Sequence, residues 1–262
     1  MTDSPARVSS VSIVIPTLNE EENIEPLISE ITACAVPFLE ILFVDDHSTD
    51  NTRGKIHDLT RTQPIRLIEQ DGADLSLAGA IMSGARAAEG EILLVMDADL
   101  SHPPDRINEL LAPLFAGAAD LVVGSRYVRG GSTPGWPIWR RIVSRTGAAL
   151  AYPLTGLHDS MGGFFAIGRS RLLDLAPQTS GFKIAFETMV RAHGTLRVHE
   201  IPIAFRERVR GKSKMSFSVA LRFFFRWLRA MFQHLARGSY HREKGGSVNS
   251  ATEALHQKAP GK

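Results

Sequence analysis

Short apolar segments alternate with amphipathic segments through the first half of the chain, and this alternation constrains the fold more than any other feature. Each apolar segment is rich in Val, Ile and Leu, as expected of a strand covered on both faces. Five strands are expected, at Val11–Ile15, Glu40–Val44, Ile65–Glu69, Ile92–Met96 and Leu121–Val123. Helices are expected between them, at about 23–34, 51–61, 77–88 and 105–115. This order predicts an α/β fold with a doubly wound, mostly parallel sheet.

Acidic residues follow three of these strands within five positions. They are Glu20 after the first strand, Asp45 and Asp46 after the second, and Asp97 and Asp99 after the fourth. Open α/β sheets bind their ligands beyond the carboxyl ends of the strands. The sequence therefore predicts a ligand site at a single sheet edge that these carboxylates share.

The composition excludes several classes of protein. Hydrophobic residues make up 44% of the 262 residues and charged residues 22%, which excludes a wholly disordered chain. Cys34 is the single cysteine, so neither a disulfide framework nor a multi-cysteine metal site can form. The first ten residues lack the apolar core of a signal peptide, and we expect a reducing, cytoplasmic setting.

The formal net charge of +2 conceals a strong asymmetry along the chain. Residues 1–204 hold 17 basic and 25 acidic residues, a net charge of −8. Residues 205–237 hold nine basic residues and one acid, a net charge of +8. The tail, 238–262, is polar and carries a net charge of +2, and its composition predicts disorder. The basic segment indicates an anionic partner: a nucleic acid, a phosphate group or a membrane surface.

The strongest local motif is Asp97-Ala98-Asp99. Two carboxylates two residues apart, directly after a buried strand, suit Mg²⁺ or Mn²⁺, which prefer oxygen ligands. The alternative is an ordinary acidic loop that caps a helix before Pro103. His102, like the other loop histidine His47, is expected to be a solvated side chain rather than a ligand.

The cluster at 45–50 has two interpretations of its own. Its carboxylates suit hydrogen bonds from a nucleobase or a ribose, but an Asp/Ser-rich turn that caps the next helix has the same composition. Glu20 is similarly ambiguous, because an acid in the first turn of a helix is stabilising in itself.

Together these motifs resemble those of the family 2 glycosyltransferases, and more narrowly the polyprenyl (dolichyl) phosphate mannosyltransferases. The resemblance covers about residues 11–237 and rests on five motifs in the family's order. The motifs are Pro16-Thr17-Leu18-Asn19-Glu20, Val44-Asp45-Asp46-His47-Ser48-Thr49-Asp50, Met96-Asp97-Ala98-Asp99-Leu100-Ser101-His102-Pro103, Gly124-Ser125-Arg126-Tyr127 and Arg208-Val209-Arg210-Gly211-Lys212-Ser213-Lys214.

The resemblance implies a GT-A fold over residues 8–214, a nucleotide-sugar donor and a divalent cation, Mg²⁺ or Mn²⁺. It implies that the nucleoside pocket is lined by Pro16, Leu18, Glu20, Val44 and Asp46. The metal on the donor diphosphate would be held by Asp97 and Asp99 with help from Ser101, and Ala98 would also contact the donor. The donor phosphates would be met from the other side by Arg126, Arg208 and Lys214.

The acceptor implied by the resemblance is a polyprenyl phosphate. Arg140, Arg141 and Arg145 are candidates to bind its phosphate, since arginine binds phosphate in a bidentate manner. A solvated basic helix face is the alternative. Asp159 would orient the acceptor, act as a base towards a hydroxyl acceptor, or cap a local turn.

Departures from the family pattern concern the donor. Leu18 stands where an aromatic residue is common, and Ser76-Leu77-Ala78 replaces the family's Gly-Leu-Gly. Met161 stands at the threonine of the family's Asp-x-Thr-Gly segment. The sequence therefore predicts the reaction class better than the sugar or the base.

The segment 215–237 is expected to form a basic amphipathic helix. Arg222, Arg226 and Arg229 lie on one helical face, and they interrupt the apolar run too often for a membrane span. The other face is apolar and includes Phe224 and Leu228, which suits the headgroup layer of an anionic membrane. Packing on the domain or on another subunit is the alternative. We expect peripheral membrane association, directly or with a separate membrane-protein partner.

The leading hypothesis is an inverting transferase that moves mannose from GDP-mannose to a polyprenyl phosphate. A variant uses UDP-glucose or another UDP-sugar, and a second hypothesis keeps the fold but transfers to a hydroxyl acceptor. A third is a nucleic-acid-binding protein that uses residues 205–237. The acidic body of the chain argues against this third hypothesis, and no nucleic acid is expected as a partner.

Overall fold

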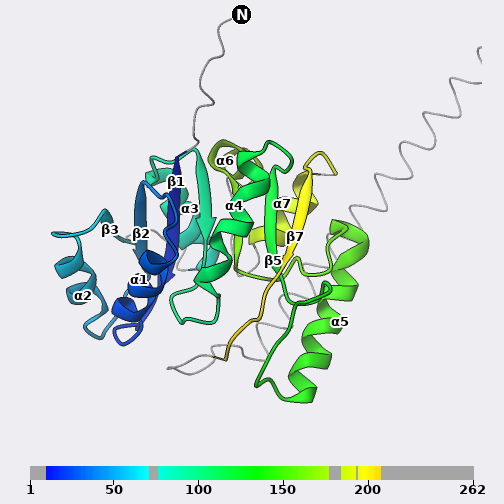
Figure 1. The fold of residues 1–262 in the computed structure, drawn as a ribbon, viewed down its shortest axis with the longest axis horizontal. Coiled ribbons are helices and arrows are strands. Elements are labelled where there is room, and N and C mark those ends of the chain that lie inside the picture. Colours follow the sequence, from blue (N-terminus) through cyan, green and yellow to red (C-terminus); the bar gives the residue numbers. More distant parts are fainter. Residues whose placement is uncertain (1–9, 71–75, 177–183, 193, 208–262) are drawn as a thin grey trace, which may run out of the picture. The chain divides into compact units, whose positions relative to one another are not determined.

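A seven-stranded mixed sheet lies at the centre of the fold (Figure 1). The computed structural model describes residues 10–70, 76–176, 184–192 and 194–207. Its strands are β1 Val11–Thr17, β2 Glu40–Asp45, β3 Ile65–Glu69, β4 Ile92–Val95, β5 Leu121–Ser125, β6 Phe165–Gly168 and β7 Val198–Pro202. The strand order is β3-β2-β1-β4-β6-β5-β7, and β1 to β5 confirm the five strands expected from the apolar segments.

The parallel part of the sheet contains the three acidic strand ends. β2, β1 and β4 are neighbours and run parallel, with Thr17 opposite Asp45 and Val14 opposite Val95. β6 is the exception, because it lies between β4 and β5 and is antiparallel to both. The doubly wound sheet is thus confirmed as mostly parallel, while β6 and β7 were not predicted.

Helices cover both faces of this sheet. They are α1 Ile24–Ala33, α2 Thr52–Leu59, α3 Leu77–Ala87, the short 3₁₀ helix η1 Pro104–Arg106, α4 Ile107–Phe115, α5 Ile138–Thr155, α6 Arg169–Leu175 and α7 Ile184–Ala192. Successive strand residues point to opposite faces. Ile13 and Phe43 therefore pack with α1 and α4, whereas Val14 and Leu42 pack with α3 and α7.

The carboxyl ends of the parallel strands carry an unusual backbone. Asn19, His47 and Leu100 have φ angles of 56°, 63° and 61°, which non-glycine residues rarely adopt. Each of the three follows a different strand, β1, β2 or β4. Such conformations cost free energy and cluster at functional sites, so they point to the same edge as the acidic residues do.

Several predictions fall on residues outside those that the structure describes. These are the amphipathic helix at 215–237, the tail at 238–262, and the phosphate-binding candidates Arg208 and Lys214. Among the helices of the described residues, none has the length and apolarity that crossing a bilayer requires.

Candidate active site

The loops that follow β1 and β2 are tied to each other by side chains. The Asn19 backbone N–H donates to Oγ of Ser48 at 2.9 Å, and the Thr49 N–H donates to Oδ1 of Asn19 at 2.8 Å. The Glu20 N–H donates to Oγ1 of Thr52 at 2.8 Å. Because these bonds join segments about thirty residues apart, the two loops form one connected wall at the sheet edge.

The residues predicted to line a nucleoside pocket differ in how they are exposed. Pro16, Leu18 and Asp46 are partly exposed at the end of the parallel strands. Oδ1 of Asp46 is buried and lacks a hydrogen-bond partner in the described part of the chain, so it can accept a hydrogen bond from a ligand. Val44 is fully buried in the core, so its side chain is not available to a ligand. The Glu20 carboxylate accepts a hydrogen bond from Nδ2 of Asn23 at 2.7 Å, but Glu20 lies before α1, which starts at Ile24, and not in its first turn.

The loop after β4 presents one accessible carboxylate and one buried carboxylate. The Asp97 side chain is 32% exposed, whereas Asp99 is only 3% exposed. Oδ1 of Asp99 accepts hydrogen bonds from the backbone N–H and the hydroxyl of Ser101, at 3.1 and 2.5 Å. Ser101 is itself buried, and Ala98 packs into the core between the two acids. These two bonds from Ser101 therefore fix the orientation of the Asp99 carboxylate.

His102 is buried, and the prediction of a solvated side chain was wrong. Its Nδ1 accepts the backbone N–H of Asp97 at 2.9 Å, so Nε2 carries the proton in the neutral ring. The ring stacks on Phe164 and meets Phe205 edge-on. Burial lowers the pKa of His102, against the raising effect of nearby Asp97 and Asp99. A neutral His102 thus holds the backbone of the acidic loop.

Asp97 and Asp99 fit a divalent cation that is shared with a phosphate ligand. The described residues contain no group of three or more His, Cys, Asp or Glu side chains that could hold a metal alone. Mg²⁺ commonly takes only one or two carboxylates and completes its shell with water and substrate phosphates. Gly163 leaves room beside the accessible carboxylate, since a Cβ at this position would lie 3.2 Å from Oδ1 of Asp97.

Arg126 and Asp159 form a buried, bidentate ion pair. Nε and Nη2 of Arg126 donate to Oδ2 and Oδ1 of Asp159 at 2.7 and 2.8 Å, and the Arg126 N–H donates to Oδ2 at 2.9 Å. Asp159 is fully buried and Arg126 is 9% exposed. Burial has the largest single effect and opposes the guanidinium charge, but the bonds and charge of Asp159 together with the charges of Tyr127 and Asp97 raise the pKa of Arg126. Both Asp159 oxygens are thus occupied by Arg126.

Glu200 on β7 supports this pair. Its carboxylate accepts the backbone N–H groups of His158 and Asp159, both at 2.9 Å, and contacts Nδ1 of His158 at 2.8 Å. The Glu200 side chain is only 10% exposed. It therefore fixes the turn from which Asp159 reaches Arg126.

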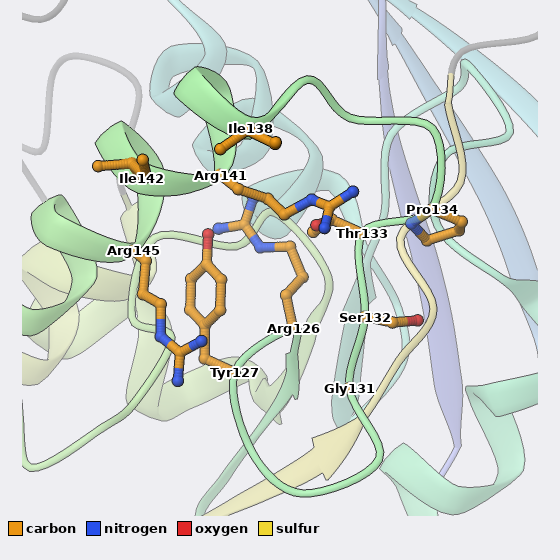
Figure 2. Close-up of a pocket in the computed structure, with 10 residues that line it drawn as sticks. All are labelled: Arg126, Tyr127, Gly131, Ser132, Thr133, Pro134, Ile138, Arg141, Ile142 and Arg145. Carbon is orange, nitrogen blue, oxygen red and sulfur yellow. The ribbon is translucent and has the colours of Figure 1, made fainter.

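A cavity of about 520 Å³ opens beside Arg126 (Figure 2). Figure 2 shows the side chains of Arg126, Arg141 and Arg145 on this cavity, with Tyr127 between them and α5 on one side. We call it the arginine pocket; its lining consists of Arg126, Tyr127, Gly131, Ser132, Thr133, Pro134, Ile138, Arg141, Ile142 and Arg145. Arg140 is placed differently, because its guanidinium stacks on the Trp136 ring at 3.9 Å. The structure thus brings two of the three predicted acceptor arginines together.

The arginine pocket adjoins the acidic loop. Phe205 contacts the rings of both His102 and Trp136, and the Arg126 guanidinium lies 5.5 Å from the centre of the Phe205 ring. Asp97 contributes to the raised pKa of Arg126, which places the two charges within electrostatic reach. The acidic loop and the arginine pocket therefore share a wall that includes Phe205.

Comparison with known proteins assigns the family. Residues 12–189 match the model of glycosyl transferase family 2. The chain belongs to this family. The resemblance expected from its motifs is thereby confirmed.

Three relatives of this family 2 chain are, by name, two dolichol-phosphate mannosyltransferases and a polyprenol monophosphomannose synthase. The dolichol-phosphate mannosyltransferase of Pyrococcus furiosus is 36% identical over 78% of this chain and 59% of the relative. The dolichol-phosphate mannosyltransferase of Saccharomyces cerevisiae is 33% identical over 81% of this chain and 83% of the relative. The polyprenol monophosphomannose synthase of Mycolicibacterium smegmatis is 38% identical over 78% and 80%. The family 2 chain thus spans 59% of the length of the Pyrococcus relative.

Solved structures confirm the GT-A fold. The glucosyl-3-phosphoglycerate synthase of Mycobacterium tuberculosis, crystallised with Mn²⁺, UDP and glucosyl-3-phosphoglycerate, superposes with a TM-score of 0.65 and 19% identity. The match covers 86% of the family 2 chain and 79% of the synthase.

Sequence reasoning missed four residues of the site: Glu200, His158, Phe205 and Gly163. Glu200, His158 and Phe205 act through partners that are distant in the sequence, so no local motif marks them. Gly163 had a signal, because two adjacent glycines precede the apolar run of β6. Glycine pairs before a strand often mark a close approach of the backbone to another group.

Proposed function

We propose that the chain transfers mannose from GDP-mannose to a polyprenyl phosphate at a membrane surface. One observation carries the proposal: a pocket with three arginines lies beside a loop with two carboxylates. The first suits an anionic acceptor and the second suits a metal-bound diphosphate. The names of the relatives from Pyrococcus, yeast and Mycolicibacterium support mannose and a polyprenyl-type phosphate.

The donor half of the proposal uses the acidic loop. Asp97 and Asp99 would hold Mg²⁺ or Mn²⁺, which when bound stabilises the negative charge that grows on the departing nucleoside diphosphate. Ser101 keeps the Asp99 carboxylate in one orientation, and His102 does the same for the Asp97 backbone. Oδ1 of Asp46, which has no hydrogen-bond partner among the described residues and lies 3.6 Å from Nδ1 of His47, would accept a hydrogen bond from the base or the ribose. Pro16 and Leu18 would complete the wall of this nucleoside site. Arg208 and Lys214, which the motifs assign to the donor phosphates, lie outside the described residues.

The acceptor half uses the arginine pocket. A phosphate monoester is already ionised near neutral pH, so it needs positioning more than deprotonation. Arg141 and Arg145 lie one helical turn apart on α5 and face the same cavity as Arg126. Their charges orient the acceptor oxygen towards the sugar and disfavour neutral acceptors.

The state of Asp159 supports a phosphate acceptor over a hydroxyl acceptor. A hydroxyl must lose its proton to a base during transfer. Asp159 was the candidate base, but both its oxygens accept hydrogen bonds from Arg126. We assign Asp159 to positioning Arg126. The proposal therefore does not require a general base.

A transfer assay tests the function. The chain is incubated with Mn²⁺, a short polyprenyl phosphate in detergent, and radiolabelled GDP-mannose or UDP-glucose. We expect label in the organic phase with GDP-mannose. If only UDP-glucose gives label in the organic phase, the donor is a UDP-sugar and not GDP-mannose. If neither donor gives label there, the assignment of a polyprenyl phosphate acceptor is refuted.

Matched variants locate the activity in the acidic loop. Asp97→Asn removes one ligand charge with little change in shape, and we expect transfer to fall by about a hundredfold or more. Asp105→Asn is the control, because Asp105 is an exposed acid on η1, in the segment that follows the loop. Equal activity of the two variants would contradict the metal role of Asp97.

A further inference from the structure

Large apolar side chains are exposed mainly on one helix. Eight such side chains are strongly exposed among the described residues, and six of them belong to α5. The exposed fractions are 73% for Ile138, 64% for Trp139, 60% for Ile142 and 54% for Val143. Exposed apolar residues scattered singly are normal, but a contiguous group marks an interaction surface.

The four residues form one face of the helix. Their spacing of one, three and four places them side by side on the exposed side of α5. The opposite side of α5 is the buried one, with Ala148, Ala151 and Thr155. Figure 1 shows α5 at the periphery, beyond β5 and β7. We call Ile138, Trp139, Ile142 and Val143 the outer face of α5.

The charge of α5 restricts which partners fit the outer face. Arg140, Arg141 and Arg145 flank it, and α5 contains no acidic residue. The chain's own basic segment, 205–237, carries a net charge of +8 and would be repelled by these arginines. A second copy of α5 would be repelled for the same reason. The chemistry that fits is both apolar and anionic, as at an anionic lipid bilayer, where Trp and Arg are favoured.

The outer face is continuous with the arginine pocket. Ile138 and Ile142 line this pocket on one side, together with Arg141 and Arg145. An acceptor with an anionic head and a hydrocarbon tail could therefore stay partly in the bilayer while its head enters the pocket. We propose that the outer face of α5 docks on an anionic lipid bilayer and holds the mouth of the arginine pocket against it. The purpose of docking rests on the proposed function, but docking itself does not.

A site-specific probe tests the docking. The full chain carries one cysteine, so Cys34→Ser with Ile142→Cys provides a single position for an environment-sensitive fluorophore. Phosphatidylcholine vesicles with and without phosphatidylglycerol are added, with neither donor nor polyprenyl phosphate. We expect a blue shift and quenching by nitroxide-labelled lipid on the anionic vesicles. Leu39→Cys in the same background is the control, because Leu39 is 47% exposed and lies outside α5.

Binding measurements provide the second test. We expect Trp139→Ser with Ile142→Ser to raise the Kd for anionic vesicles by about tenfold or more, since two apolar side chains no longer enter the bilayer. Leu39→Ser with Phe115→Ser, which removes the two large apolar side chains that are exposed outside α5 in the described part of the chain, should leave the Kd unchanged.

Three results would overturn the docking proposal. The first is that the chain does not bind the vesicles. The second is that it binds them while the emission of the fluorophore at position 142 stays unchanged. The third is that this emission is already blue-shifted without vesicles. The last result would mean that the chain itself or a second copy covers the outer face. Transfer to a short acceptor in detergent is measured separately, so loss of docking and loss of the proposed function are distinguishable.

Discussion

Arg126 and Asp159 are shielded from water almost completely, so neither can lose its partner cheaply. We expect Asp159→Ala to lower the free energy of unfolding by about 3–5 kcal/mol, because it leaves a buried guanidinium uncompensated. Urea denaturation followed by circular dichroism measures this change. Arg126→Met with Asp159→Leu should restore much of the stability without restoring transfer. A stable Asp159→Ala variant would show that the pair is not needed for folding.

Gly163 controls the space beside the accessible metal-binding candidate. In Gly163→Ala the new methyl group lies 3.2 Å from Oδ1 of Asp97, closer than ordinary contact, so the carboxylate must shift. We expect transfer to fall about tenfold and the Mn²⁺ concentration for half-maximal activity to rise, with little change in Tm. Gly147→Ala is the control, because its new methyl group would lie 3.8 Å from Cε of Met161, which is ordinary contact. Gly117→Ala is unsuitable because Gly117 has a positive φ. An unchanged Mn²⁺ dependence would contradict the prediction.

At the scale of elements, the strands that could be predicted are those whose signal is local. β1, β2 and β4 are nearly continuous apolar runs, and their ends are marked by acids. β6 is only four residues long, and its antiparallel pairing with β4 and β5 joins residues that are 42 to 76 positions apart in the sequence. β7 reads Val-His-Glu-Ile-Pro and is partly exposed, so it lacks a buried-strand pattern.

The same distinction holds for the site. Asp97 and Asp99 follow a predicted strand and could be found from the sequence. His102 could not, because its burial depends on Phe164 and Phe205, which come from distant segments. The arginines of α5 were predicted as a group, and only the fold separates Arg140 from the pocket.

An ion pair ties the start of β7 to the start of β5. Arg197 donates to both oxygens of Asp120, and these bonds lower the Asp120 pKa to about 2 from 3.8. The pair therefore stabilises the fold above pH 3.8, and this contribution is lost as the pH falls towards 2.

The pH dependence of stability tests this ion pair. We expect Asp120→Asn to cost no more than about 1 kcal/mol at neutral pH, because Arg197 is largely exposed. The difference from the parent chain should shrink as the pH falls below 3.8, as measured by denaturant unfolding at each pH. Asp58→Asn, an exposed acid on α2, is the control. A difference that does not vary with pH would assign the effect to something other than the charge.

For the whole molecule, the excess of acidic residues in 1–204 has an electrostatic consequence. A net charge of −8 repels an anionic nucleotide, so binding should depend strongly on a cation. We expect GDP with Mn²⁺, at about a hundred times its Kd, to raise Tm by about 5–10 °C, and GDP without metal to raise it much less. Thermal unfolding with GDP and with UDP, each in the presence and absence of Mn²⁺, measures these shifts in Tm. A larger shift with UDP would favour the UDP-sugar donor.

The antiparallel direction of β6 affects which insertions and deletions this fold can tolerate during evolution. A parallel strand supplies the active edge with the loop that follows it, but β6 supplies the loop that precedes it. That loop contains both Asp159, the partner of Arg126, and Gly163, the neighbour of Asp97. Phe165 stands opposite Val95 and Val123, so its register anchors the loop between the two halves of the site. An inserted or deleted residue between 159 and 164 would disturb both halves at once, and this short segment should tolerate length variation least.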